Sequence, residues 1–263
     1  MPLRRLLFTL LCLSAVALPA ADTPKVETRT CTLRFAWWNF PNKVPELALQ
    51  MGRDRVPVTP NPMSLSTAIE YQGDVNAVLL KKVLSAETDK TGKPKISWAP
   101  YATIVLTAKD TDIGVLLIPN EKDDSCITRP FDFSLETFPF GTLKLVNLSR
   151  ARIACSLEGE IFVTEPGLVG QCPKRFEERA TASIAVAALE ADGQQRVLYS
   201  TKVILNKTFR TLFFIVEKEG KDEDRYQSQC ILDVNPYPNG VPPPPPVPSK
   251  GKAAGKPTVN TAK

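Results

Sequence analysis

The chain repeats one ordered series of short apolar runs, and this repeat constrains the fold more than any other feature of the sequence. The matched segments, in chain order, are residues 32–35 and 142–145, 83–87 and 187–190, 95–98 and 196–199, 104–106 and 203–205, and 115–118 and 212–215. Each series closes on a Cys followed by an Ile, at Cys126 and at Cys230. Because the order is kept and the spacing is similar, the repeat predicts an internal duplication into two units of roughly 100 residues each.

The repeated runs are typical of β-strands, because β-branched and aromatic residues dominate them and turn residues separate them. In the first run, the two-residue alternation places Cys31, Leu33 and Phe35 on one face. Alanine and glutamate in residues 176–191 would also suit a helix. The repeat aligns that segment with a strand, so we expect a strand there. The sequence thus predicts an all-β protein of two tandem β-sandwich-like domains, each of immunoglobulin-like size.

The first 20 residues have the pattern of a secretory signal peptide. Arg4 and Arg5 precede an apolar run over residues 6–18, and the small residues Ala20 and Ala21 follow. The run is shorter than the roughly 20 apolar residues of a membrane span. We therefore expect an exported protein, located in the periplasm, at the cell surface or outside the cell, with no stable membrane span once the signal is removed.

Composition sets the other boundaries. Residues 236–263 hold a proline block at 242–246 and four lysines without any acidic residue, a composition that favours a disordered, extended tail over a packed core. We expect a signal peptide at 1–20, a β domain at 21–136, a second β domain at 137–235 and the tail at 236–263. Arg4, Arg5 and the tail lysines account for six of the 33 basic residues, so the body carries 27 against 28 acidic ones. A body so balanced lacks the basic face that nucleic acids require.

The chain contains no histidine, which excludes a Ser-His-Asp triad, a Cys-His dyad and histidine-ligated metal within this chain. It also lacks the G-x-S-x-G, Walker, G-x-G-x-x-G and C-x-x-C patterns. We expect no catalytic residues, no metal and no cofactor. Acid pairs are the remaining route to catalysis, as in glycoside hydrolysis. They occur as Asp110 with Asp112, Asp123 with Asp124, and residues 222–224, where solvated turns are the alternative interpretation.

Five cysteines follow the signal and indicate disulfide bonds in an oxidising compartment. They are Cys31, Cys126, Cys155, Cys172 and Cys230. One interpretation joins Cys31 to Cys126 and Cys155 to Cys172, which leaves Cys230 over. A second joins Cys155 to Cys230 and leaves Cys172 over. Spacing alone does not decide the connectivity.

The aromatic sequence Trp37, Trp38, Asn39, Phe40 is the candidate ligand or partner surface. Neighbours on an extended chain point to opposite faces, so one Trp can be core while the other faces solvent or the sister domain. An exposed indole beside Asn39 would stack on a sugar ring or on a partner side chain. The alternative is that domain packing covers both.

The ordered pattern resembles a group of exported bacterial proteins with two tandem β domains and no assigned activity. The resemblance lies in the signal peptide and in residues 117–119, 138–143, 146–149, 197–200 and 211–214. It covers most of the body and not the tail. The group implies the fold, and it implies no catalytic residues.

These patterns together predict an exported, non-catalytic structural, adhesive or assembly protein of the cell envelope, with an envelope protein or polysaccharide as its partner. They do not set its oligomeric state. The alternatives are a carbohydrate-binding module that uses the Trp37 region and a carboxylate-dependent polysaccharide-active enzyme. An exposed aromatic strip would favour the module, and an acid pair in a cleft would favour the enzyme. A broad apolar patch on an edge or face would favour protein assembly.

Overall fold

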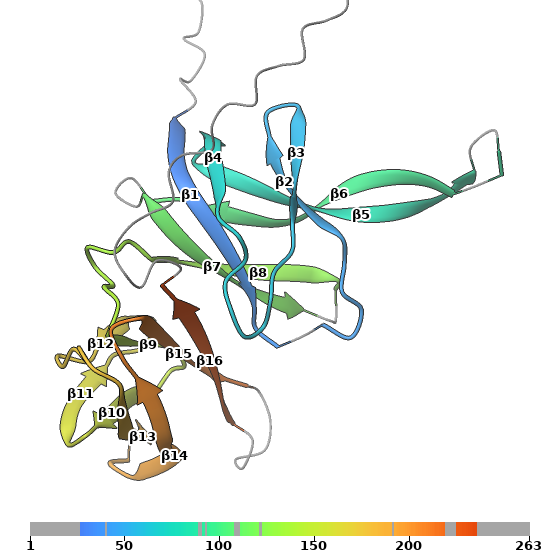
Figure 1. The fold of residues 1–263 in the computed structure, drawn as a ribbon. Helices are drawn as coiled ribbons and strands as arrows, with labels where there is room; N and C mark the ends of the chain where they lie inside the picture. The colour runs from blue at the N-terminus through green and yellow to red at the C-terminus, as the bar shows by residue number, and fades with distance from the viewer. Residues whose placement is uncertain are drawn as a thin grey trace, which may run out of the picture.

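The structure, a computed structural model, describes residues 27–39, 41–88, 91–92, 94–107, 111–120, 123–190, 192–218 and 225–235. Within these ranges the chain forms sixteen strands and no helix. The expected signal peptide at 1–20 and tail at 236–263 lie outside the described residues. The predicted all-β fold is confirmed, and the strands form four sheets of four strands each (Figure 1).

The first eight strands build two of these sheets. Sheet A has the order β4-β1-β7-β8, and sheet B has the order β3-β2-β5-β6. The strands are β1 (Thr28–Trp37), β2 (Leu47–Met51), β3 (Asp54–Val58), β4 (Ile69–Asp74), β5 (Asn76–Thr88), β6 (Pro94–Val105), β7 (Asp112–Asn120) and β8 (Ser125–Asp132). The two sheets pack face to face over one apolar core that includes Leu33, Leu49, Leu79 and Val115.

The second eight strands build the other two sheets. Sheet C has the order β12-β9-β15-β16, and sheet D has the order β11-β10-β13-β14. The strands are β9 (Leu143–Leu148), β10 (Arg152–Leu157), β11 (Glu160–Thr164), β12 (Val169–Gln171), β13 (Ala180–Leu189), β14 (Gln195–Leu205), β15 (Phe209–Glu217) and β16 (Tyr226–Val234). Their core includes Leu145, Ile153, Val186 and Phe213.

The two halves correspond strand for strand. Adding eight to each strand number of sheet A gives the order of sheet C, and the same operation turns sheet B into sheet D. Both central sheets also hold one parallel pair, β1 with β7 and β9 with β15. A duplication predicts such a correspondence, although the duplication itself stays a prediction.

The alanine-rich segment forms strand β13, as the repeat predicts. Ala182, Ile184, Val186 and Ala188 alternate with exposed or half-buried residues and face the second core. Small residues at the other positions lose little by facing water on the pleated surface. Tertiary packing therefore outweighs the helix propensity of alanine here.

Strand β7 of sheet A and strands β9 and β15 of sheet C are buried on both faces because the two sheets also pack against each other. A third apolar cluster joins Leu116 and Phe131 of sheet A to Val146, Leu212 and Phe214 of sheet C. The molecule is therefore a stack of four layers in the order B, A, C, D, with β7 and β8 beside β15 and β16 (Figure 1). Burial on both faces explains why the central strands are continuous apolar runs rather than alternating ones.

Candidate functional site

The two tryptophans of the candidate surface are both buried, on opposite sides of the chain where β1 ends at Trp37. Trp37 is 0% exposed and lies in the first core, whereas Trp38 is 4% exposed and lies in the cluster between sheets A and C. Neither indole is accessible for stacking on a sugar ring. The two-face alternation predicted from the sequence is present, and it directs Trp38 to the sister domain instead of to solvent.

Asn39 is exposed, and it makes contacts between the domains. Its backbone has a φ of 54°, and its N–H donates to Gln229 Oε1 at 2.9 Å. Gln229 Nε2 in turn donates to the backbone oxygens of Trp37, at 2.7 Å, and of Pro62, at 2.5 Å. Phe40 lies outside the described residues. As far as the structure describes it, the predicted ligand surface is a domain contact.

Arg210 of β15 is the central polar residue of this domain junction. It is 2% exposed, and its Nε donates to Asp233 Oδ2 at 2.7 Å. Its Nη1 donates to the backbone oxygens of Phe133 and Phe138, at 2.8 and 2.9 Å. The guanidinium also lies 3.6 Å from the centroid of the Phe133 ring. One side chain of the second half thereby holds the segment that links the two halves.

Further charges surround Arg210 and compensate each other. Arg34 of β1 lies 3.8 Å from Asp112 and 3.8 Å from Asp233. Burial raises the pKa of Asp112, and Arg34 and Arg210 oppose that rise. Lys144 is buried over the Phe138 ring, and burial lowers its pKa while Asp132 opposes the change. Each carboxylate here faces a cation, which is typical of a structural ion network.

Of the acid pairs, the structure describes Asp112, Asp123 and Asp124. Asp112 belongs to the junction, whereas Asp123 and Asp124 lie exposed in the turn between β7 and β8. A hydrogen bond from the Ser125 hydroxyl lowers the pKa of Asp123, and Asp124 forms an ion pair with Lys81. Asp110 and residues 222–224 lie outside the described residues.

The sequence interpretation that joined Cys31 to Cys126 is wrong in this fold. Cys31 precedes Thr32, which pairs with Asp112 of β7, whereas Cys126 pairs with Pro119 near the other end of β7. Cys31 therefore lies level with residue 111 and Cys126 with residue 119, which are eight residues or about 26 Å apart along the strand direction. A disulfide requires Cα atoms within about 7 Å. The first and last strands of the half share a sheet, but the two cysteines occupy opposite ends of it.

The cysteines of the second half are differently placed. Cys155 and Cys172 are buried in the second core, and burial raises the pKa of Cys155 to about 12, with a further contribution from the neighbouring Cys172. Cys230 packs against the same core from β16, which is three strands away from β12 across sheet C. No disulfide joins any two cysteines of the described ranges.

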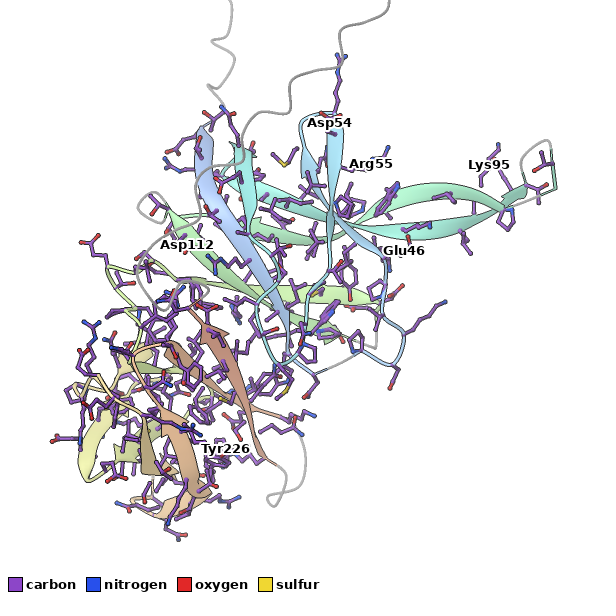
Figure 2. All side chains as sticks on the ribbon, viewed as in Figure 1. Glu46, Asp54, Arg55, Lys95, Asp112 and Tyr226 are labelled. Atoms are coloured by element: carbon purple, nitrogen blue, oxygen red, sulfur yellow. The ribbon has the colours of Figure 1, made fainter. Side chains whose placement is uncertain are left out.

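The most exposed apolar pair of the first half lies on a hairpin arm that sequence reasoning missed. Strands β5 and β6 extend as a two-stranded ribbon beyond the rest of sheet B (Figure 1). Leu84, 66% exposed, pairs directly with Ile96, 58% exposed. Lys82 pairs with Trp98 on the same face, and the guanidinium of Arg55 lies 5.6 Å from the Trp98 ring. The side chains of the arm are shown in Figure 2, where Arg55 and Lys95 are labelled. We call Leu84, Ile96 and Trp98 the arm patch.

A cavity of about 530 Å³ lies in the second half, lined by Arg150, Ala151, Arg152, Leu189, Glu190 and Arg225. Two of its three guanidinium groups already have partners. Arg225 donates to Glu217 and to Glu190, and Arg152 donates to Glu165. The cavity is therefore close to charge balance.

The described part of the chain gathers no cluster of three or more Cys, Asp and Glu side chains that would bind a metal ion. No helix within it has the length and apolar character needed to cross a membrane. No protein-family model matches this chain, and no curated protein matches it by sequence.

Proposed function

We propose that the protein is an exported, non-catalytic assembly component of the cell envelope that binds another envelope protein through the arm patch. The observation that carries the proposal is the exposed Leu84 and Ile96 pair at the end of a projecting hairpin. The signal pattern of residues 1–20 supports the location.

The arm has the composition of a protein interface. Its centre is apolar and aromatic, and ion pairs of Lys82 with Glu46 and of Lys95 with Glu87 lie around it. A central apolar group with a polar rim is characteristic of binding surfaces between proteins. A two-stranded ribbon is also marginally stable by itself in water, so cover from a partner would stabilise it.

The body behind the arm supports the same role because it is held together as one unit. Sheets A and C share the apolar cluster around Phe131 and Phe214, and Arg210 bonds across the junction. Because the two halves are packed together, a partner bound to the arm would be held in a fixed position relative to the whole body. The resemblance to exported two-domain proteins without assigned activity agrees with this proposal.

A disulfide between Cys155 and Cys172 belongs to the proposal. The two thiols lie in one core and influence each other electrostatically. An oxidising compartment would allow them to form a bond between sheets C and D. The alternative bond of Cys155 to Cys230 is disfavoured because β16 lies against β14, whereas Cys155 lies on β10, two strands away from β14 in sheet D.

The test compares capture of envelope protein by the wild type, by Leu84→Asp and Ile96→Asp, and by the control Val105→Asp. Val105 lies on the same strand β6 and is 60% exposed, but it lies away from the arm tip. After fixation with a cross-linker, we expect either arm variant to reduce capture at least about tenfold, the effect of losing one central apolar contact. The control should retain capture, and circular dichroism should show all three variants folded.

Equal capture by the arm variants and the wild type would contradict the proposal. Release of reducing sugar from envelope polysaccharide by the purified wild type would contradict its non-catalytic part. Cell fractionation of the full chain, with the mass of the mature protein, tests export, and an unprocessed chain in the cytoplasm would refute it.

A further inference from the structure

Strand β11 forms an outer edge of sheet D, and the interior of this strand is apolar. The interior residues are Ile161, Phe162 and Val163, with Glu160 and Thr164 at the ends. Ile161 is 69% exposed and Val163 is 41% exposed. An outer strand with unpaired backbone groups and apolar side chains is a template for pairing with a further strand.

The hairpin geometry identifies the backbone groups that face outward. A two-residue loop of Glu158 and Gly159, with φ of 51° and 84°, joins β10 to β11, as in a type I′ turn. The loop is closed by the pair Leu157 and Glu160. Because hydrogen bonding alternates along an antiparallel strand, Glu160, Phe162 and Thr164 bond to β10. The N–H and C=O groups of Ile161 and Val163 therefore point away from the sheet.

Strand β3 occupies the same position in sheet B, and there the outward positions are blocked. The loop that starts with Gly52 joins β2 to β3, and Met51 pairs with Asp54. The same alternation makes Arg55 and Pro57 the outward residues. A charged side chain and a proline are two common ways to prevent pairing at an edge. Two edges at equivalent places in the fold thus differ in the feature that controls strand addition.

We propose that β11 pairs antiparallel with β11 of a second copy of this chain, with the twofold axis at Phe162. In this register Ile161 lies opposite Val163 of the second copy, so the outward N–H and C=O groups of both residues meet their complements. Glu160 lies opposite Thr164, and no like charges face each other. The two D sheets become one continuous sheet of eight strands.

The apolar side chains support the same pairing. Ile161 and Val163 point to the outer face of sheet D because Phe162, between them, packs against the core. The pairing brings both residues of one copy beside those of the other, which removes four exposed apolar side chains from water. The proposal goes beyond the proposed function and does not depend on the arm, which belongs to sheet B at the other end of the stack.

The first test measures the oligomeric state of the full processed protein by sedimentation equilibrium, up to about 500 μM because interfaces this small bind weakly. We expect a concentration-dependent dimer for the wild type. A double variant Ile161→Arg with Val163→Pro should stay monomeric, because it has the residue types of Arg55 and Pro57 at the equivalent positions of β3. The control Val197→Arg changes a residue that is 68% exposed on β14, at the other edge of the same sheet, and should still form the dimer.

The second test fixes the register and does not depend on the folding of the proline variant. Mixing Ile161→Cys protein with Val163→Cys protein under oxidising conditions should give a cross-linked dimer, because directly opposite Cβ atoms lie about 5 Å apart. Either variant alone should cross-link at least several-fold less, since its like residues are offset diagonally. A monomeric wild type over the whole range, a dimer that survives the double variant, or cross-linking that is equal in mixed and single samples would each overturn the proposal.

Discussion

Replacement of Arg210 by methionine removes the guanidinium at the domain junction and keeps most of the apolar stem. The change leaves the backbone oxygens of Phe133 and Phe138 without their donor and Asp233 without its closest cation. Breaking a buried ion pair by removing one partner costs about 3–5 kcal/mol. Arg34 lies 3.8 Å from Asp233 and compensates part of the loss, so we expect a value near about 3 kcal/mol.

The free energy of unfolding would be measured by urea denaturation, with thermal melting as a second probe. For a chain of this size, about 3 kcal/mol corresponds to a decrease in melting temperature of about 6–12 °C. The matched control is Arg152→Met, because Arg152 also pairs with an acid, Glu165, but both side chains are about half exposed. An exposed pair contributes at most about 1 kcal/mol.

A double-mutant cycle with Asp233→Asn separates the ion pair from the backbone contacts. We expect a coupling energy above about 1 kcal/mol, because the two residues are in direct contact. If Arg210→Met and Arg152→Met were equally stable, burial of the guanidinium at the junction would not matter and the reasoning would be refuted.

Three further predictions concern individual residues. Trp37→Ala should destabilise the protein by about 3–5 kcal/mol, because the indole is fully buried in the first core; a melting temperature unchanged from the wild type would contradict this. Because burial raises the pKa of Asp112, its contribution to stability is present below the unfolded-state pKa of about 3.9 and is lost as pH rises through the higher folded value. The melting temperature of Asp112→Asn should therefore rise relative to that of the wild type as the pH increases from about 3 to about 6. An equal difference in melting temperature at both pH values would contradict this prediction. Alkylation of the processed protein in urea without reductant should label three thiols, and reduction should release two more, from Cys155 and Cys172; five labels before reduction would exclude the disulfide.

Local patterns in the sequence were sufficient for the strands that contain the repeated runs and for their side-chain faces. Alternation along β1 predicts that Trp37 and Trp38 point to different environments, and the structure places them in two separate clusters. The repeat predicts strand β13 against the helix propensity of its alanines. These predictions succeed because they depend on neighbours within a few residues.

The same local patterns do not predict which strands pair with each other. The sequence does not show that β1 lies parallel to β7, so the interpretation that joined Cys31 to Cys126 was wrong. The length of the arm was also not predictable, because Leu84 and Ile96 continue the same apolar pattern as the buried parts of these strands. One signal was available for the junction: Arg210 stands at the start of an apolar run, where a charge needs a buried partner.

The parallel pairing of β1 with β7 determines when the first domain is able to fold. Strand β1 ends at Trp37, and its central partner in sheet A spans Asp112–Asn120, about 80 residues later. A chain that emerges N-terminus first holds β1 without this partner until β7 has followed, and a similar but shorter delay recurs between β9 and β15. Contacts of such long range make folding slow. We therefore expect the nascent chain to stay open for a long stretch of its synthesis, a state that would suit the export proposed above.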